Sequence, residues 1–185
     1  MQRDPNKILV DSIKRLLRRG ATSHLSNIVN KTHAADMSVI FRSLTLTSQQ
    51  MLFDMIEDVE QKGVLISELE DNIIIAFVDK IELNELVNIL EYMQADDVAD
   101  LVGKLPEEKS DAILELMEKE DSEEVEELLS YRDDTAGGIM VPDFIALREE
   151  ITSKEAIESL QKEHQDVEMP FYLYVVDEYG RLVGV

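Results

Sequence analysis

Residues 85–105 read ELVNILEYMQADDVADLVGKL, and one apolar pattern occurs in this stretch twice, twelve residues apart. Apolar residues at positions i, i+3, i+4 and i+7 lie on one face of an α-helix. A short helix with such a face is stable only when the face is buried against a neighbour. The two faces consist of Leu86, Ile89, Leu90 and Met93, and of Val98, Leu101, Val102 and Leu105.

The pattern continues at the same spacing in both directions, which marks an internal repeat. Beside Gly63 the register slips by one residue, and the pattern then resumes toward the N-terminus. In the forward direction the pattern comprises Ile113, Leu114 and Met117, then Val125 and Leu129. In the backward direction it comprises Ile74, Phe77, Val78 and Ile81; Leu65, Ile66 and Leu69; Leu52, Phe53 and Ile56; Met37, Ile40, Phe41 and Leu44; Leu25, Ile28 and Val29; and Ile13, Leu16 and Leu17.

One continuous helix cannot accommodate this repeat. Twelve residues make about 3.3 helical turns, so the apolar face would rotate by roughly 120° per repeat. The chain must therefore turn within each repeat, and start signals fit this: Thr47 with Gln50, and Asp121 with Glu124, have capping-box spacing, while Pro106 suits a first helical turn. We predict a mainly α fold, a right-handed superhelical stack of short helices (an α-solenoid). An ordinary helical bundle with accidental spacing is the alternative.

The pattern changes after Tyr131, where residues 133–147 read DDTAGGIMVPDFIAL. Two adjacent glycines permit backbone angles that other residues avoid, and the proline stops a helix. We therefore predict a helical domain over residues 1–131, a junction over 132–142 and a second domain over 143–185.

The second domain has mixed secondary-structure signals. Residues 144–147, 171–176 and 182–185 have the β-branched and aromatic composition of strands, with a turn at 178–180. A capping box formed by Thr152 and Glu155 opens a helix whose predicted inward side chains are Ala156, Ile157 and Leu160. The predicted order is strand, helix, strand, strand, which is a partial α/β motif.

The charge of the chain is unevenly distributed. The net charge is −22, but residues 1–33 contain seven Lys or Arg against two acids, whereas residues 34–185 contain 11 basic against 38 acidic residues. An acidic surface repels nucleic-acid phosphates and attracts cations, so cations are the first partners to consider and nucleic acid is not expected. The basic start is interpreted as the end unit of the stack, with contact to anionic lipids or to the acidic body as alternatives. Its charges are Lys14, Arg15, Arg18 and Arg19.

The end of the chain, YVVDEYGRLVGV (174–185), resembles the first motif of a cystathionine-β-synthase-type (CBS) domain. A twelve-residue helical ladder, then DDTAGGIM with a following Pro-Asp, then a CBS motif, resembles the intracellular region of MgtE magnesium transporters. This resemblance implies a homodimer on the cytoplasmic side of the bacterial inner membrane, attached to a transmembrane domain that lies outside this chain. It also implies that Mg²⁺ bridges the helical and CBS domains and closes the pore. The absence of cysteine fits a cytoplasmic location.

The resemblance also implies metal ligands. The family's helical domain contributes carboxylates from a segment matching ADDVAD (95–100), so Asp96 and Asp100 are the corresponding residues, and Gly138 matches a junction glycine whose carbonyl lies near an ion. Both aspartates are expected to be exposed. Their i, i+4 spacing alone does not distinguish a site from a solvated surface. The same spacing occurs in Asp111/Glu115, Glu120/Glu124 and Glu123/Glu127.

Other functions are less well supported. No nucleophile elbow, glycine-rich phosphate loop or catalytic triad is present, so an enzyme is not expected. His24, His33 and His164 lack metal-ligand spacing and are interpreted as surface or core residues. Two alternatives stay open: a soluble helical adaptor that binds a protein partner, and an adenylate-sensing CBS protein. The second motif of a CBS pair, which nucleotide binding would need, is expected beyond residue 185.

Overall fold

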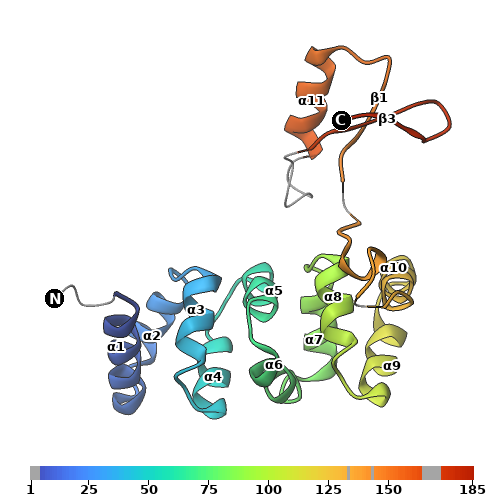
Figure 1. Ribbon diagram of the computed structural model, residues 1–185. Coiled ribbons are helices and arrows are strands. Elements are labelled where there is room, and N and C mark those ends of the chain that lie inside the picture. The colour runs from blue at the N-terminus through green and yellow to red at the C-terminus, as the bar shows by residue number, and fades with distance from the viewer. Residues whose placement is uncertain (1–4, 133, 143, 164–171) are drawn as a thin grey trace. The chain divides into compact units, whose positions relative to one another are not determined.

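The computed structural model describes residues 5–132, 134–142, 144–163 and 172–185. The chain divides into two compact units, residues 1–138 and 139–185 (Figure 1). The first unit is helical, and the second combines a helix with a three-stranded sheet. The mainly α fold followed by an α/β part is therefore confirmed. The domain boundaries at 131 and 143 stay a prediction.

The repeat seen in the sequence sets where the helices begin. From α2 to α4 they begin at residues 22, 34 and 46, and from α5 to α10 at 59, 71, 83, 95, 107 and 119. The one longer step, from 46 to 59, lies just before the helix that contains Gly63, so the register slip falls a few residues before the predicted position. The bounds are α1 Pro5–Arg19, α2 Thr22–Val29, α3 Ala34–Phe41, α4 Leu46–Phe53, α5 Val59–Ser67, α6 Asp71–Val78, α7 Leu83–Leu90, α8 Ala95–Val102, α9 Glu107–Leu116 and α10 Lys119–Leu129.

The predicted helix starts were partly wrong. Helix α4 begins at Leu46 after the N-cap residue Thr45, so Thr47 lies inside the first turn. Helix α10 begins at Lys119, so Asp121 also lies inside its first turn. Pro106 is the N-cap residue directly before α9 rather than its first helical residue. The repeat of apolar burial, rather than local capping chemistry, determines where these helices begin.

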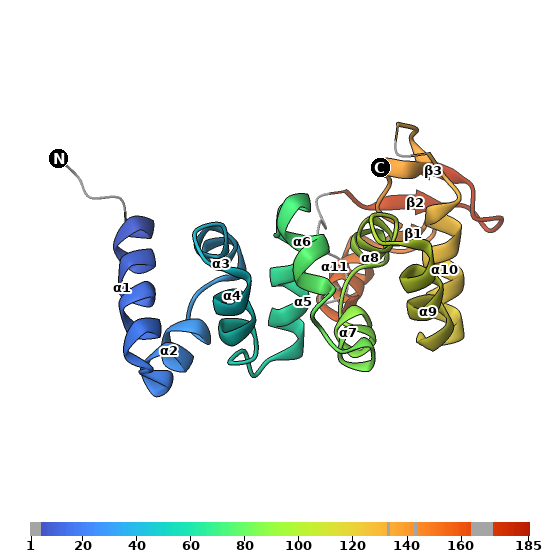
Figure 2. The same cartoon turned by 90° about the horizontal axis from the view of Figure 1, so that it is seen from below.

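The helices of this unit pack in two columns, seen from below in Figure 2. Alternate helices contact one another: α1 packs on α3, α3 on α5, α5 on α7 and α7 on α9, while α2 packs on α4, α4 on α6 and α8 on α10. Helix α1 also packs on α2. Each helix is thus stabilised by its second neighbour along the chain, which is the arrangement expected of a solenoid.

A single apolar cluster extends through the unit, from Ile13 to Leu128. Nearly every residue of the predicted apolar faces is buried or partly buried in it. Leu129 is the exception, because Leu128 takes the buried position while Leu129 is 36% exposed. Helix α10 packs on α8 through its i, i+3 row, so Val125 pairs with Leu128 rather than with Leu129.

Several helix ends are closed by a side chain from a later helix. The last carbonyl of α3, at Phe41, accepts a hydrogen bond from Gln49 Nε2 (2.8 Å), and that of α8, at Val102, accepts one from Ser110 Oγ (2.8 Å). Lys109 Nζ donates to the last carbonyl of α6, at Val78 (3.0 Å). The last carbonyls of a helix lack intrahelical partners, so these side chains satisfy groups that burial would otherwise destabilise.

The second unit contains a mixed sheet in the order β1-β2-β3. Strand β1 (Ala146–Arg148) pairs in parallel with β2 (Tyr174–Val176), and β2 pairs antiparallel with β3 (Leu182–Gly184). Helix α11 (Ser153–Glu163) connects the parallel pair, as a parallel connection requires. The predicted order is confirmed. Each strand is shorter than predicted, and Phe171 lies outside the residues that the structure describes.

The capping box of α11 is present. Glu155 Oε2 accepts a hydrogen bond from the backbone N–H of Thr152 (2.7 Å), while the Glu155 N–H approaches Thr152 Oγ1 (3.4 Å). The backbone bond from Thr152, with the bond from its hydroxyl, lowers the pKa of Glu155. Ala156 and Leu160 are half-buried as predicted, but Ile157 is 55% exposed, so its inward prediction is wrong.

Candidate functional site: the acidic start of helix α8

Helix α8 presents three carboxylates close to its N-terminus. Gln94 is the N-cap residue, Asp96 and Asp97 lie in the first turn, and Asp100 follows one turn later. Negative charge at a helix N-terminus is favourable because the first backbone N–H groups are unpaired and the helix dipole is positive there. Several acidic side chains close together are therefore tolerated at this end of the helix.

Asp96 is the unusual member of this group. Its Oδ1 atom is buried and accepts no hydrogen bond from any group in the parts of the chain that the structure describes. A buried carboxylate oxygen without a partner is costly, and such an atom needs a cation, a water or a proton to satisfy it. Asp96 was expected to be exposed, and the structure corrects this, because the residue is half-buried.

The partial burial of Asp96 has a signal in the sequence that the twelve-residue pattern does not use. Ala99 is buried, and it lies three residues after Asp96 on the same side of α8. The buried face of this helix is thus wider than the four-residue apolar pattern, and Asp96 lies at its edge. Asp100 is exposed, as predicted.

Gly138 lies in a short 3₁₀ turn, η1 (Gly137–Ile139), after α10. Its backbone N–H donates to Thr135 Oγ1 (3.3 Å), and Gly138 is half-exposed. Because the 3₁₀ turn has only three residues, the Gly138 carbonyl is not part of a long helix. Among the described residues, no hydrogen bond or ion pair joins Gly138 to Asp96 or Asp100. The structure places the two aspartates on one helix and does not bring the glycine to them by a direct contact.

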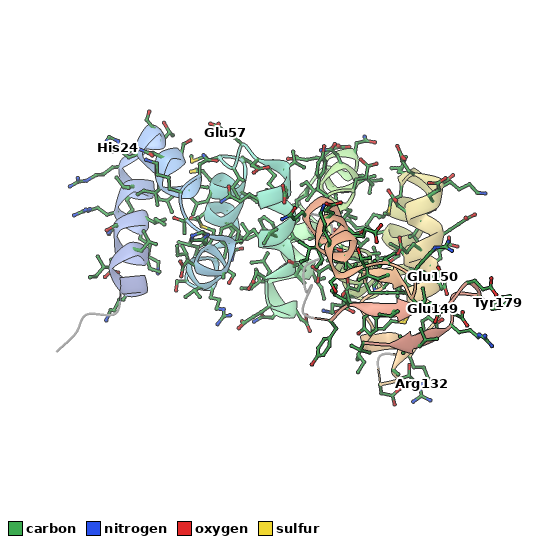
Figure 3. The ribbon with its side chains drawn as sticks, turned by 90° about the horizontal axis from the view of Figure 1, so that it is seen from above. His24, Glu57, Arg132, Glu149, Glu150 and Tyr179 are labelled. Carbon is green, nitrogen blue, oxygen red and sulfur yellow. The ribbon has the colours of Figure 1, made fainter. Side chains whose placement is uncertain are left out.

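The remaining candidate ligands are separate from this helix. Within the described ranges, no group of three or more His, Asp or Glu side chains is close enough to hold a metal ion together. His24 and His33 are exposed, and His24 points away from the helices around it (Figure 3). His164 lies outside the described residues. A cation at α8 would therefore take few protein ligands and keep much of its water shell.

Comparisons with known proteins identify the family to which this chain belongs. Residues 32–134 match the family model of the MgtE intracellular N domain, and residues 136–185 match that of the CBS domain. The chain belongs to the MgtE family. None of the helices in the described part of the chain is both long enough and apolar enough to cross a membrane.

Curated MgtE proteins align with nearly the whole chain. The magnesium transporter MgtE of Thermus thermophilus is 29% identical over 180 residues, which cover 96% of this chain and 40% of the relative. The magnesium transporter MgtE of Bacillus subtilis is 27% identical, with coverage of 92% and 38%. The chain thus spans about two fifths of the length of these relatives.

Two solved structures show the same fold. The soluble part of a magnesium transporter superimposes with a TM-score of 0.84 at 22% identity, covering 97% of this chain and 70% of that one. The cytosolic domain of the Mg²⁺ channel MgtE in complex with ATP also has a TM-score of 0.84, at 27% identity, covering 94% of this chain and 71% of that one.

Proposed function

We propose that this chain is the magnesium-sensing regulatory region of a magnesium transporter, on the cytoplasmic side of the bacterial inner membrane. The observation that carries the proposal is an alignment of 180 residues, 96% of this chain, with a magnesium transporter of the same family. A transmembrane domain and a second copy of the chain are its proposed partners. The region has a regulatory rather than a catalytic role.

The proposed ligands of Mg²⁺ are Asp96 and Asp100, with the carbonyl of Gly138 as a further ligand. The buried Oδ1 of Asp96 supports this, because it is an acceptor that no described protein group satisfies. Mg²⁺ prefers oxygen ligands, keeps several waters and needs only one or two carboxylates. A site with so few protein ligands is weak, in the millimolar range or about −4 kcal/mol.

Weak Mg²⁺ binding by one helix can regulate the pore when a second acidic surface completes the binding site in only one conformation. Mg²⁺ then favours the closed form by its differential affinity for that form, and the pore shuts when Mg²⁺ is abundant. In this proposal the helical and CBS domains supply the two acidic surfaces. Joined to its transmembrane domain, the Asp96→Ala/Asp100→Ala variant should keep transporting at Mg²⁺ concentrations that normally close the pore.

The test on this chain is a Mg²⁺ titration followed by NMR of backbone amides. The parent should show saturable shifts at residues 94–100, and the Asp96→Ala/Asp100→Ala variant should lose them. The matched control is Asp111→Ala/Glu115→Ala, which removes an exposed acidic pair of the same spacing from α9 and should leave the shifts of α8 intact. Equal loss in both variants, or no saturable shift in the parent, would show that α8 is not a magnesium site.

A second candidate function, adenine-nucleotide binding by the CBS part, is favoured by one observation: the cytosolic domain of a relative was solved in complex with ATP. Calorimetric titration with ATP, with and without Mg²⁺, tests it on this chain extended through the second CBS motif that nucleotide binding would need. Heat that saturates at one ATP per chain would support nucleotide binding, and absence of heat would leave magnesium as the single proposed ligand.

A further inference from the structure

The cations of this chain fall into two groups. From Arg42 onward, most of the described Lys and Arg side chains form ion pairs. The pairs include Arg42–Glu70 (3.2 Å), Lys62–Glu85 (2.7 Å), Lys104–Asp71 (2.9 Å), Lys109–Asp79 (3.7 Å), Lys119–Glu123 (3.1 Å) and Arg181–Asp177 (2.7 Å). Before Arg42, no described Lys or Arg has a carboxylate within 4.0 Å. Residues 1–33 contain seven Lys or Arg against two acids, so acids are scarce around α1 and its cations are left without carboxylate partners.

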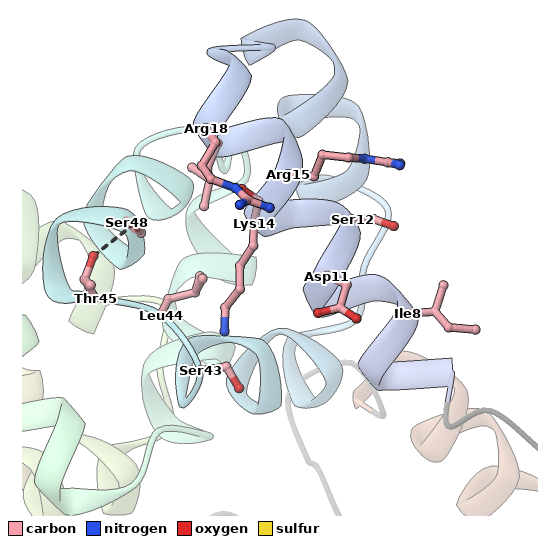
Figure 4. Close-up of a pocket in the computed structure, with 11 residues that line it drawn as sticks. Ile8, Asp11, Ser12, Lys14, Arg15, Arg18, Ser43, Leu44, Thr45 and Ser48 are labelled. Carbon is pink, nitrogen blue, oxygen red and sulfur yellow. Dashed lines mark hydrogen bonds between the residues drawn. The ribbon is translucent and has the colours of Figure 1, made fainter.

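Three of the unpaired cations, Lys14, Arg15 and Arg18, border a cavity between α1 and the α3–α4 connection, with a volume of about 680 Å³ (Figure 4). Lys14 crosses this space, and its ammonium group points toward Ser43 (Figure 4). The facing wall is formed by hydroxyl-bearing residues and the start of α4. The wall residues are Ser43, Leu44, Thr45 and Ser48.

Lys14 is half-buried, and its ammonium group has no described carboxylate within 4.0 Å. Arg18, one turn later, has its guanidinium oriented by a bond from Nε to the carbonyl of Lys14 (3.2 Å), and its two terminal nitrogens have no described partner. The hydroxyls of Thr45 and Ser48 are 3.0 Å apart and supply donors on the opposite side. Helix α4 has no acid in its first turn. All of these groups favour an anion.

We propose that the cavity between α1 and the α3–α4 connection binds a phosphate group. Lys14 supplies the central charge, Arg18 the planar pair of N–H donors that phosphate accepts, and the hydroxyls of Ser43, Thr45 and Ser48 the remaining hydrogen bonds. The phosphate belongs either to a small phosphorylated solute or to the headgroup of an anionic phospholipid. The residues that line the cavity include neither Asp96, Asp100 nor Gly138, so this site is separate from the proposed magnesium site at α8.

One carboxylate also borders the cavity, that of Asp11, which makes no ion pair within 4.0 Å with Lys14 or Arg15. This carboxylate opposes anion binding, so a variant that removes its charge should have the opposite effect on phosphate affinity from the variants of Lys14 and Arg18. Asp11→Asn should tighten phosphate binding, whereas Lys14→Gln and Arg18→Gln should weaken it. Arg18 is exposed, so its replacement does not disturb the apolar core. The matched control is Arg19→Gln, an equal change of charge on the same helix at a residue that does not line the cavity.

The first arm of the test is NMR titration of the chain with inorganic phosphate, at ionic strength held constant with sodium chloride. Amides of residues 43–48 and of α1 should shift saturably. Lys14→Gln and Arg18→Gln should each weaken binding about tenfold, since a hydrogen bond to a charged group contributes that much, while Arg19→Gln changes it less than about twofold. If Arg19→Gln loses as much binding as Lys14→Gln, the proposal is overturned. If the parent shows no saturable shift, the proposal is overturned when the second arm is also negative.

The second arm is co-sedimentation of the chain with vesicles of phosphatidylcholine, with or without phosphatidylglycerol. Sedimentation that needs phosphatidylglycerol and is lost in Lys14→Gln but kept in Arg19→Gln assigns the phosphate to a lipid headgroup. Saturable phosphate shifts without sedimentation assign it to a solute. Failure in both arms would sink the proposal. Neither result bears on Mg²⁺ at α8.

Discussion

At the scale of single residues, close packing and local hydrogen bonds decide what can be changed. Gly63 lies in α5 where that helix packs on α7. A Cβ atom placed there would be 2.8 Å from Cγ of Met93 and 3.6 Å from the carbonyl oxygen of Ile89. The glycine thus allows the two helices to approach, in the helix that follows the slip of the twelve-residue register.

We expect Gly63→Ala to lower the free energy of unfolding by about 1–3 kcal/mol, because the clash with Met93 exceeds the helix propensity gained. In a Met93→Ala background the same substitution should be neutral or stabilising, by up to about 1 kcal/mol. Urea denaturation of the four proteins measures both effects. An equal effect of Gly63→Ala in both backgrounds would show that contact with Met93 is not the cause.

Asp177 closes the turn between β2 and β3. Its carboxylate accepts hydrogen bonds from the backbone N–H groups of Arg181 and Tyr179 (2.9 Å each) and from the Arg181 guanidinium (2.8 Å to Nε). The backbone bond from Arg181, then its side chain, lower the pKa of Asp177. Because the pKa in the folded state lies below the ordinary value, the resulting stability is complete above that value and is lost as pH falls through the folded pKa.

We therefore expect the second unit to lose stability on acidification below about pH 4, the ordinary range of an Asp carboxyl. Arg181→Gln should raise the pKa of Asp177 only part of the way toward its ordinary value, since the backbone bond remains. NMR titration of the Asp177 carboxyl carbon measures this. Complete return to the ordinary value in Arg181→Gln would show that the side chain, rather than the backbone, lowers the pKa.

At the scale of the helices, side chains from later helices form hydrogen bonds with the unpaired carbonyls at the ends of short helices. Gln49 is 5% exposed, and its amide is the hydrogen-bond donor that closes α3 at Phe41. Gln49→Leu keeps the volume and removes the donor, so the buried carbonyl of Phe41 loses its partner. We expect a loss of about 1–3 kcal/mol in the free energy of unfolding.

Gln50→Leu is the matched control, because this neighbouring glutamine makes no side-chain hydrogen bond among the bonds described for α4. Chemical denaturation of the two variants should place Gln49→Leu well below the parent and Gln50→Leu close to it. Similar losses would mean that the stability comes from the glutamine side-chain packing and not from closing α3.

The helices also show what a sequence can predict. The twelve-residue apolar repeat predicted where ten of the described helices lie and which side of each is buried, since burial is the main force on helices this short. Capping signals were less reliable, as Thr47 and Asp121 show, because a tertiary fold can start a helix one or two residues away from its best cap. The half-burial of Asp96 was missed because the apolar repeat does not include Ala99, whose burial widens the buried face of α8.

At the scale of the whole molecule, net charge and exposed apolar strands act in opposite directions. Strand β3 exposes Leu182 (62%) and Val183 (53%), and the chain ends at Val185, which is 74% exposed. An exposed apolar strand edge favours association with another chain, whereas a net charge of −22 opposes it.

We therefore expect self-association that increases with salt because salt screens the charge. Magnesium chloride should increase it more than sodium chloride at equal ionic strength, because the acidic surface concentrates divalent cations more strongly. Sedimentation velocity across a concentration series measures it. Val183→Glu should reduce association, and Val64→Glu, at a 45% exposed residue of the helical unit, should not reduce it. A monomer at every salt concentration, with rapid amide exchange through residues 172–185, would contradict a role for this strand.

The alternation of contacts between second neighbours has a consequence for how such a domain can change in length. Helices of odd number pack with odd, and those from α2 to α6 and from α8 to α10 pack even with even. Deleting one helix would shift every later helix into the opposite column and turn its apolar face away from its former partners. Deleting or duplicating two consecutive helices, about 24 residues, preserves the parity. Relatives of different length should therefore differ by helix pairs, and a lone extra helix should occur only at an end, where α1, at 15 residues, already departs from the common length.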